Sequence, residues 1–159
     1  MKSALLAFGV ATATLPAVAD HLIVVKVGGT NFVAKVEDTA TGRAFMEKLP
    51  LTLDMSELNG NEKYCHGVDL PTAAQYCDKI APGDLMLYGS GCLVLFYGAA
   101  GGYSYTRVGK LTSTDGLAKA VGKGAATVTF AKAKFPTLTD KESAIVDVGA
   151  AAAAATQQS

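Results

Sequence analysis

The segment 49–64 constrains the fold more strongly than any other part of this 159-residue chain. Between residues 51 and 56 apolar and polar residues alternate, and this period of two predicts a strand that is buried on one face only. The dipeptide Asn59-Gly60 follows, and because both residues tolerate a positive φ we expect the chain to reverse there into a second, polar strand. One face of such a strand belongs to a core, and the other is free to display side chains.

Short apolar runs separated by glycine turns continue along the chain. Thr39 or Thr41 can cap a first helix, Pro50 follows its end, and Gly122 is expected to end a second helix. The stretch 67–82 is the longest one without a clear pattern. Strands are expected over 21–27, 31–37, 51–58, 61–64, 85–88, 92–97, 103–111 and 126–130, and helices over 43–49 and 114–121. Many short antiparallel strands with two short helices predict a mainly-β, closed barrel of about eight strands with a helix at each end.

The N-terminal sequence is typical of an export signal. Lys2 precedes a short apolar stretch, and Ala17-Val18-Ala19 resembles a cleavage site. We therefore expect a signal peptide over 1–19, a barrel domain over 20–131 and a low-complexity tail over 132–159, in a secreted or periplasmic protein. The alternative for 1–19 is a disordered or helical extension. The apolar stretch is too short to predict a membrane span, and no membrane insertion is expected after signal removal.

The three cysteines suggest one disulfide and one buried thiol. In an oxidising compartment a Cys65–Cys77 bond would close the loop between them and contribute about 2–3 kcal/mol. The alternative, a metal site of Cys65, His66 and Cys77, matches no common zinc spacing, so no metal is predicted. Cys92 lies in an apolar run and is predicted to be a buried free thiol.

The charge balance argues against two classes of partner. Lysine plus arginine and aspartate plus glutamate number 14 each, so the chain carries no net charge. A balanced chain lacks the basic footprint that nucleic acids or anionic membrane surfaces attract. Neither is expected as a partner.

Three strings, over 49–64, 82–97 and 103–111, together resemble the bacterial cyclophilin-like family of β-barrel proteins, and the resemblance extends over 22–130. It implies an eight-stranded barrel, and because some members are joined to flavodoxin-like domains it also implies a redox protein partner. True cyclophilins are prolyl isomerases with a Phe-His-Arg string, which this chain lacks. Tyr105 stands at the place of a second cyclophilin histidine, and there is no tryptophan.

Arg107 is the sharpest candidate for a binding residue. Tyr103, Tyr105 and Arg107 are expected on one face of a strand, where a guanidinium beside two phenols suits an anionic or carbonyl oxygen. Glu62 and Asn59, at the predicted turn, complete the candidate site. The alternative is an arginine with a structural role, paired with Asp84, Glu57 or Glu62.

Other candidates have simpler interpretations. All six tyrosines lie between residues 64 and 105, and several of them can line one groove. Lys63 is predicted to be a solvated partner of Glu62. Ser90 lies between glycines in a turn without the strand-to-helix context of a hydrolase nucleophile, so no catalytic residue is predicted.

These observations predict an exported barrel whose open rim binds a small molecule or an extended peptide, with no cofactor. The first alternative is a divergent prolyl isomerase in which Arg107 stabilises the twisted amide. The second is a protein-interaction module for a flavodoxin-like redox partner.

Overall fold

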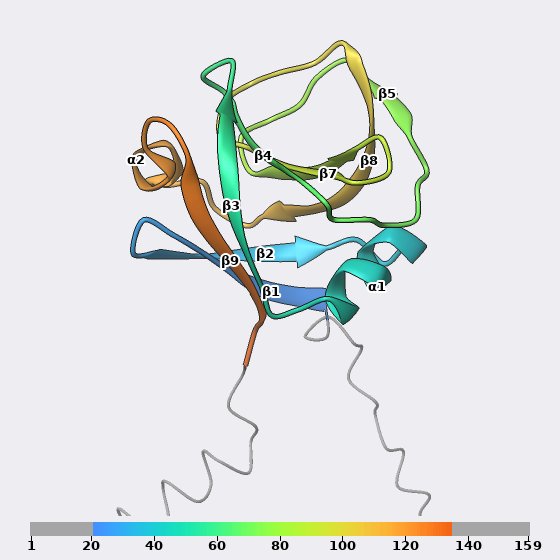
Figure 1. Ribbon diagram of the computed structural model, residues 1–159, viewed down its shortest axis with the longest axis horizontal. Helices are drawn as coiled ribbons and strands as arrows, with labels where there is room; N and C mark the ends of the chain where they lie inside the picture. Colours follow the sequence, from blue (N-terminus) through green and yellow to red (C-terminus); the bar gives the residue numbers. More distant parts are fainter. Residues whose placement is uncertain (1–20, 135–159) are drawn as a thin grey trace, which may run out of the picture.

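Nine strands and two helices are present in the computed structural model, which describes residues 21–134 (Figure 1). The mainly-β prediction and both predicted helices are confirmed, with bounds close to those expected. The elements are β1 (Leu22–Val27), β2 (Thr30–Val36), α1 (Ala40–Glu47), β3 (Leu51–Leu58), β4 (Glu62–His66), β5 (Gln75–Cys77), β6 (Asp84–Tyr88), β7 (Cys92–Phe96), β8 (Tyr103–Leu111), α2 (Leu117–Val121) and β9 (Ala126–Lys132).

Eight of the strands close into an antiparallel barrel in the order β2-β1-β9-β3-β4-β7-β6-β8. The barrel closes where β2 pairs with the C-terminal half of β8, from Ala34 opposite Leu111 to Val36 opposite Gly109. The ninth strand, β5, lies outside the barrel and pairs with the N-terminal end of β8. β5 was not predicted, because its three residues show no usable periodicity and only pairing with β8 defines the strand.

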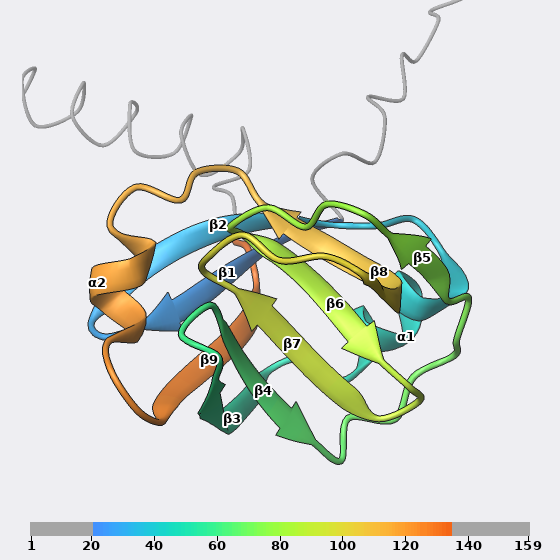
Figure 2. The same cartoon turned by 90° about the horizontal axis from the view of Figure 1, so that it is seen from above.

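The two helices lie at opposite ends of the barrel, as predicted (Figure 2). α1 begins after Thr39, whose side-chain oxygen accepts a hydrogen bond of 3.1 Å from the backbone N–H of Gly42. α2 ends at Gly122 as expected, but it begins after Gly116, three residues later than the predicted start at residue 114.

Among residues 21–134, no helix has the length and apolar character needed to cross a membrane.

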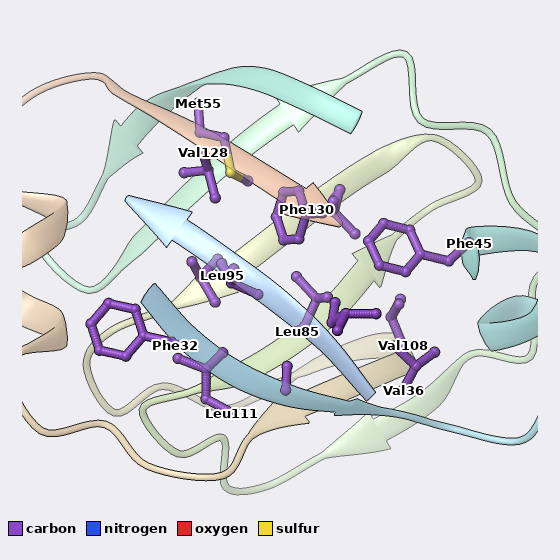
Figure 3. Packing of buried hydrophobic residues seen from close by; sticks show 14 of the residues in the cluster. Phe32, Val36, Phe45, Met55, Leu85, Leu95, Val108, Leu111, Val128 and Phe130 are labelled. Carbon is purple, nitrogen blue, oxygen red and sulfur yellow. The ribbon is translucent and has the colours of Figure 1, made fainter. Parts of the chain in front are cut away.

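The interior of the barrel is filled by apolar side chains from every barrel strand and both helices (Figure 3). Leu85, Leu95 and Val108 are fully buried there. Phe45 of α1 meets Phe130 of β9 edge-on, with ring centroids 5.6 Å apart, so that α1 covers one end of the barrel. Because these side chains fill the interior, it offers little space for a ligand.

A second apolar cluster lies on the outer face of β6, β7 and β8. Leu85 and Leu87 point inward, so the alternating Met86 points outward, where it joins Val94 and Phe96. The segments after β5 and after β7 cover this face and are held together by two backbone hydrogen bonds between Ile80 and Ala100. Burial on both faces explains why residues 85–87 of β6 and all of β7 are apolar.

The predicted Cys65–Cys77 disulfide is wrong: both cysteines are free, as is Cys92. Cys65 packs against the interior cluster, whereas Cys77 belongs to the outer cluster, so the barrel wall separates them. Hydrogen bonds and apolar anchors hold the intervening loop instead. Val68 and Leu70 donate backbone hydrogen bonds to the β6–β7 turn and are themselves buried.

The predicted signal peptide over 1–19 lies outside the described residues, as does the predicted tail from residue 135 onward. β9 continues to Lys132, one residue past the predicted domain boundary.

Candidate functional site

A cavity of about 480 Å³ lies on the outer face of the wall formed by β4, β7, β6 and β8, which Figure 2 shows side by side. The β3–β4 turn and the loop after β7 border it. We call it the tyrosine cavity, and it is lined by Leu58, Asn59, Asn61, Glu62, Tyr64, His66, Tyr88, Cys92, Val94, Ala100, Gly101, Tyr103 and Tyr105. The sequence analysis expected the cavity at the open rim of the barrel, but it lies on the outer face of the wall. Apolar side chains fill the interior of the barrel.

Four of the six tyrosines line the tyrosine cavity. Tyr105 is buried in its floor, where its ring lies edge-on to Phe96 with centroids 5.6 Å apart. Tyr88 packs against Tyr105 at 5.5 Å and is half exposed, while Tyr103 is 62% exposed. Burial, helped by the nearby Glu62 carboxylate, raises the pKa of Tyr105 to about 12. The Tyr105 phenol thus remains a neutral hydrogen-bonding group with an apolar face.

The β3–β4 turn brings Asn61 and Glu62 into the same site. Asn59 and Gly60 have φ of 55° and 72°, as expected for a tight turn between antiparallel strands. Backbone N–H groups of Tyr97 and Gly98 donate to the carbonyl of Asn61 at 2.9 and 3.0 Å. The Asn61 side chain donates to the carbonyl of Ala99 at 3.1 Å. These bonds fix the turn against the loop that forms the facing border.

Glu62 begins β4 and is only 7% exposed, although its side chain lines the tyrosine cavity. Burial, together with repulsion from the Glu57 carboxylate, raises the pKa of Glu62 above its ordinary value of 4.5. Within residues 21–134 no ion pair involves this carboxylate. The site therefore holds a partly desolvated carboxylate.

Of the five predicted site residues, the structure brings Tyr103, Tyr105, Glu62 and Asn59 together and leaves Arg107 out. Arg107 pairs with Met86 in the β6–β8 ladder and is exposed. It shares the outer face with Tyr105 but lies beyond the cavity, next to a bulge in the ladder. The alternative role of Arg107, an ion pair with Asp84, Glu57 or Glu62, is not found either. Within residues 21–134 the ion-pair partner of Asp84 is Lys110 and that of Glu57 is Lys63.

Lys63 was predicted to be a solvated partner of Glu62, and this prediction is wrong. The residue is fully buried and lies on the opposite face of β4. Its ammonium group donates to Glu57 Oε2 at 2.5 Å and to the carbonyls of Gly122 and Gly124 at 2.9 and 2.5 Å. Desolvation acts to raise the pKa of Glu57, but hydrogen bonds from Lys63, Tyr97 and the turn outweigh it and lower that pKa. The prediction failed because neighbours on a strand point to opposite faces.

Sequence reasoning expected several tyrosines to line one groove without singling out Tyr64 and Tyr88, and it did not place His66 or Cys92 in the site. The signal for two of them was present: Glu62, Tyr64 and His66 alternate along one strand and so share a face. Tyr88 and Cys92 join them only through the β6–β7–β4 register, which no local pattern reveals.

The site contains no activated nucleophile among the described residues. Burial, with the nearby Glu62 and Cys65, raises the pKa of the Cys92 thiol, which favours the unreactive protonated form. Within residues 21–134 no group of three or more histidine, cysteine, aspartate or glutamate side chains is placed to hold a metal ion. The lining combines aromatic faces with one carboxylate and includes no arginine or lysine.

The comparisons with known proteins agree with this fold. A model of the Cyclophilin-like family matches residues 25–131, which is more than half of the chain and nearly the whole barrel. The chain therefore belongs to the cyclophilin-like family. No curated protein and no solved structure matched the sequence.

Proposed function

We propose that this cyclophilin-like barrel binds a small organic molecule in the tyrosine cavity. The observation that supports the proposal is the cavity itself: about 480 Å³ of space lined by four tyrosines and a nearly buried carboxylate. Ligand sites commonly combine such apolar and aromatic walls with a few polar groups that orient the ligand.

The borders of the cavity favour a small molecule over an extended peptide. The β3–β4 turn and the loop after β7 are joined by the hydrogen bonds of Asn61 to Tyr97, Gly98 and Ala99. A strand-like peptide needs either a free sheet edge or a groove open along its length. The wall strands β4, β7 and β6 are each paired on both sides and offer no such edge.

The prolyl-isomerase alternative has no support from the site. That alternative required a cationic donor beside an apolar pocket, and Arg107 is not in the lining. Export of the protein and a flavodoxin-like partner remain predictions.

A mutant pair tests the proposal. Tyr103→Ala removes an exposed wall of the cavity, and Tyr76→Ala, a matched control, removes a tyrosine that is 65% exposed but not in the lining. A library of cationic, neutral and anionic fragments is screened against the ¹⁵N-labelled chain by amide shifts at Val94 and Ala100. We expect cavity ligands whose affinity falls about threefold to tenfold in Tyr103→Ala and is unchanged in Tyr76→Ala. Absence of any fragment that shifts these amides would reject the proposal.

A further inference from the structure

The carboxylate of Glu62 is the least expected group in the tyrosine cavity. It is nearly buried, it faces the cavity, and within residues 21–134 it makes no ion pair and no hydrogen bond. The charge that acts on it is the carboxylate of Glu57, which repels it. The carboxylate oxygens still reach water through the cavity, but a carboxylate that is partly desolvated and has no partner is unfavourable for the fold. Its position is explained if a ligand supplies the missing partner.

One other acceptor at this wall also lacks a donor. The Oδ1 atom of Asn61 is buried and accepts no hydrogen bond, and the bond from its Nδ2 to the Ala99 carbonyl fixes which way the amide points. A ligand that satisfies the Glu62 carboxylate and this amide oxygen must therefore bring N–H or O–H donors. An anionic ligand would add a further negative charge beside Glu62 and Glu57.

The aromatic lining favours the same kind of ligand. Tyrosine faces carry negative electrostatic potential and attract cations, and this attraction is strongest where water is excluded. Four tyrosines and one carboxylate line the cavity, and no lysine or arginine in the lining competes for them.

We propose that the ligand of the tyrosine cavity is an organic cation with N–H donors, such as an arylalkyl ammonium ion, whose nitrogen binds Glu62 and whose apolar part lies against Tyr64, Tyr88, Tyr103 and Tyr105. This inference rests on the proposed function and specifies its ligand class. The ammonium group would pair with the carboxylate by a charge-assisted hydrogen bond.

Three probes of similar size and different charge test the inference on the full-length chain. They are 2-phenylethylammonium, the neutral 2-phenylethanol and the anionic 3-phenylpropanoate, each titrated while the amide shifts of Val94 and Ala100 are followed. We expect the ammonium ion to bind about tenfold or more tightly than the neutral probe, and the anion to bind least.

Two variants assign the preference to one carboxylate. Glu62→Gln keeps the shape of the side chain and removes its charge, and it should reduce the ammonium affinity to that of the neutral probe. Glu47→Gln, on the exposed face of α1, removes the same charge outside the cavity and should change nothing. The folding of each variant is checked by its amide spectrum without ligand.

The outcomes separate this inference from the proposed function. Equal binding of the ammonium ion and the alcohol, or an unchanged preference in Glu62→Gln, would overturn the inference and leave small-molecule binding intact. No shift with the ammonium ion also overturns it, and the fragment screen then decides whether the cavity binds other molecules. The inference is supported if the preference for the ammonium ion over the alcohol is lost in Glu62→Gln and retained in Glu47→Gln.

The pH dependence provides a second measurement. Ammonium binding needs ionised Glu62, so affinity is present above the folded-state pKa and is lost as the pH falls through it. Because that pKa is raised, the loss begins at a higher pH than for an exposed glutamate. In Glu62→Gln this step should be absent, and a step that persisted there would contradict the assignment. The other titratable groups around Glu62 are Glu57, Tyr64, His66, Tyr88, Cys92, Tyr103 and Tyr105.

Discussion

Glu62 and Lys63 are adjacent on β4, and their side chains lie on opposite faces of the barrel wall. Glu62 faces the tyrosine cavity without a partner, whereas Lys63 is fully buried with three oxygen acceptors. The two carboxylates of this region consequently have opposite effects on stability. The lowered pKa of Glu57 stabilises the fold above its ordinary pKa, and this stabilisation is lost as the pH falls through the folded-state value. The raised pKa of Glu62 makes its ionised form unfavourable for folding.

Replacing Lys63 tests how much its network contributes to the fold. Lys63→Met retains much of the side-chain volume but removes the donor to Glu57 and to the carbonyls of Gly122 and Gly124. We expect the free energy of unfolding to fall by about 3–5 kcal/mol, because the acceptors are left unpaired. Urea unfolding followed by circular dichroism measures the change.

The control is Lys26→Met, on an exposed position of β1. It should change the free energy of unfolding by no more than about 0.5 kcal/mol. Similar losses in the two variants would show that the network adds little to stability.

At the scale of elements, the β1–β2 hairpin and α2 depend on two consecutive glycines. Gly28 and Gly29 have φ of 57° and 77°, values that favour glycine at both positions. They differ in their surroundings. A Cβ on Gly28 would lie 2.2 Å from the carbonyl oxygen of Ala120 in α2, whereas a Cβ on Gly29 would have no heavy atom within 4 Å. The turn therefore serves both as a reversal and as a packing surface for the helix.

Alanine at each position separates these two roles. Gly29→Ala should destabilise the protein by about 1–2 kcal/mol through backbone strain alone. Gly28→Ala should add about 1–3 kcal/mol to a similar strain, because α2 must move away from the turn. Thermal unfolding of both variants measures the difference, and equal midpoints would mean that α2 adjusts without cost.

At the scale of the whole molecule, closure of the barrel depends on close approach of β2 and β8. A Cβ on Gly109 would lie 2.6 Å from the carbonyl oxygen of Lys35 across this seam. Closure leaves no free edge between these strands, which also prevents edge-to-edge association. It also fixes β8, whose other end supplies Tyr103 and Tyr105 to the tyrosine cavity.

Gly109→Ala tests this seam. We expect a loss of about 1–3 kcal/mol in the free energy of unfolding, with faster amide exchange concentrated in β2 and the C-terminal half of β8. Ser104→Ala, at an exposed position of the same strand, is the control and should leave exchange unchanged. Faster exchange spread evenly over all strands would argue against a local opening of the seam.

Local patterns predicted most of the elements, because each signal is contained within a few residues. The alternation over 51–56, the Asn59-Gly60 turn and the Thr39 cap all appear in the structure as expected. Sequence reasoning also placed Tyr103, Tyr105, Glu62 and Asn59 in one site, through the shared face of a strand and the position of a turn.

The sequence by itself determined the approximate positions of both helices and of all strands but β5, together with the mainly-β class, since backbone preferences and side-chain periodicity are local. Only the tertiary structure decided which strands pair and which side chains on each strand face the interior, the cavity or the solvent. It separated Cys65 from Cys77, left Arg107 outside the cavity, buried Lys63, and added Tyr88 and Cys92 to the lining. These outcomes depend on register and closure between strands far apart in the chain, which are set by the packing of the whole barrel.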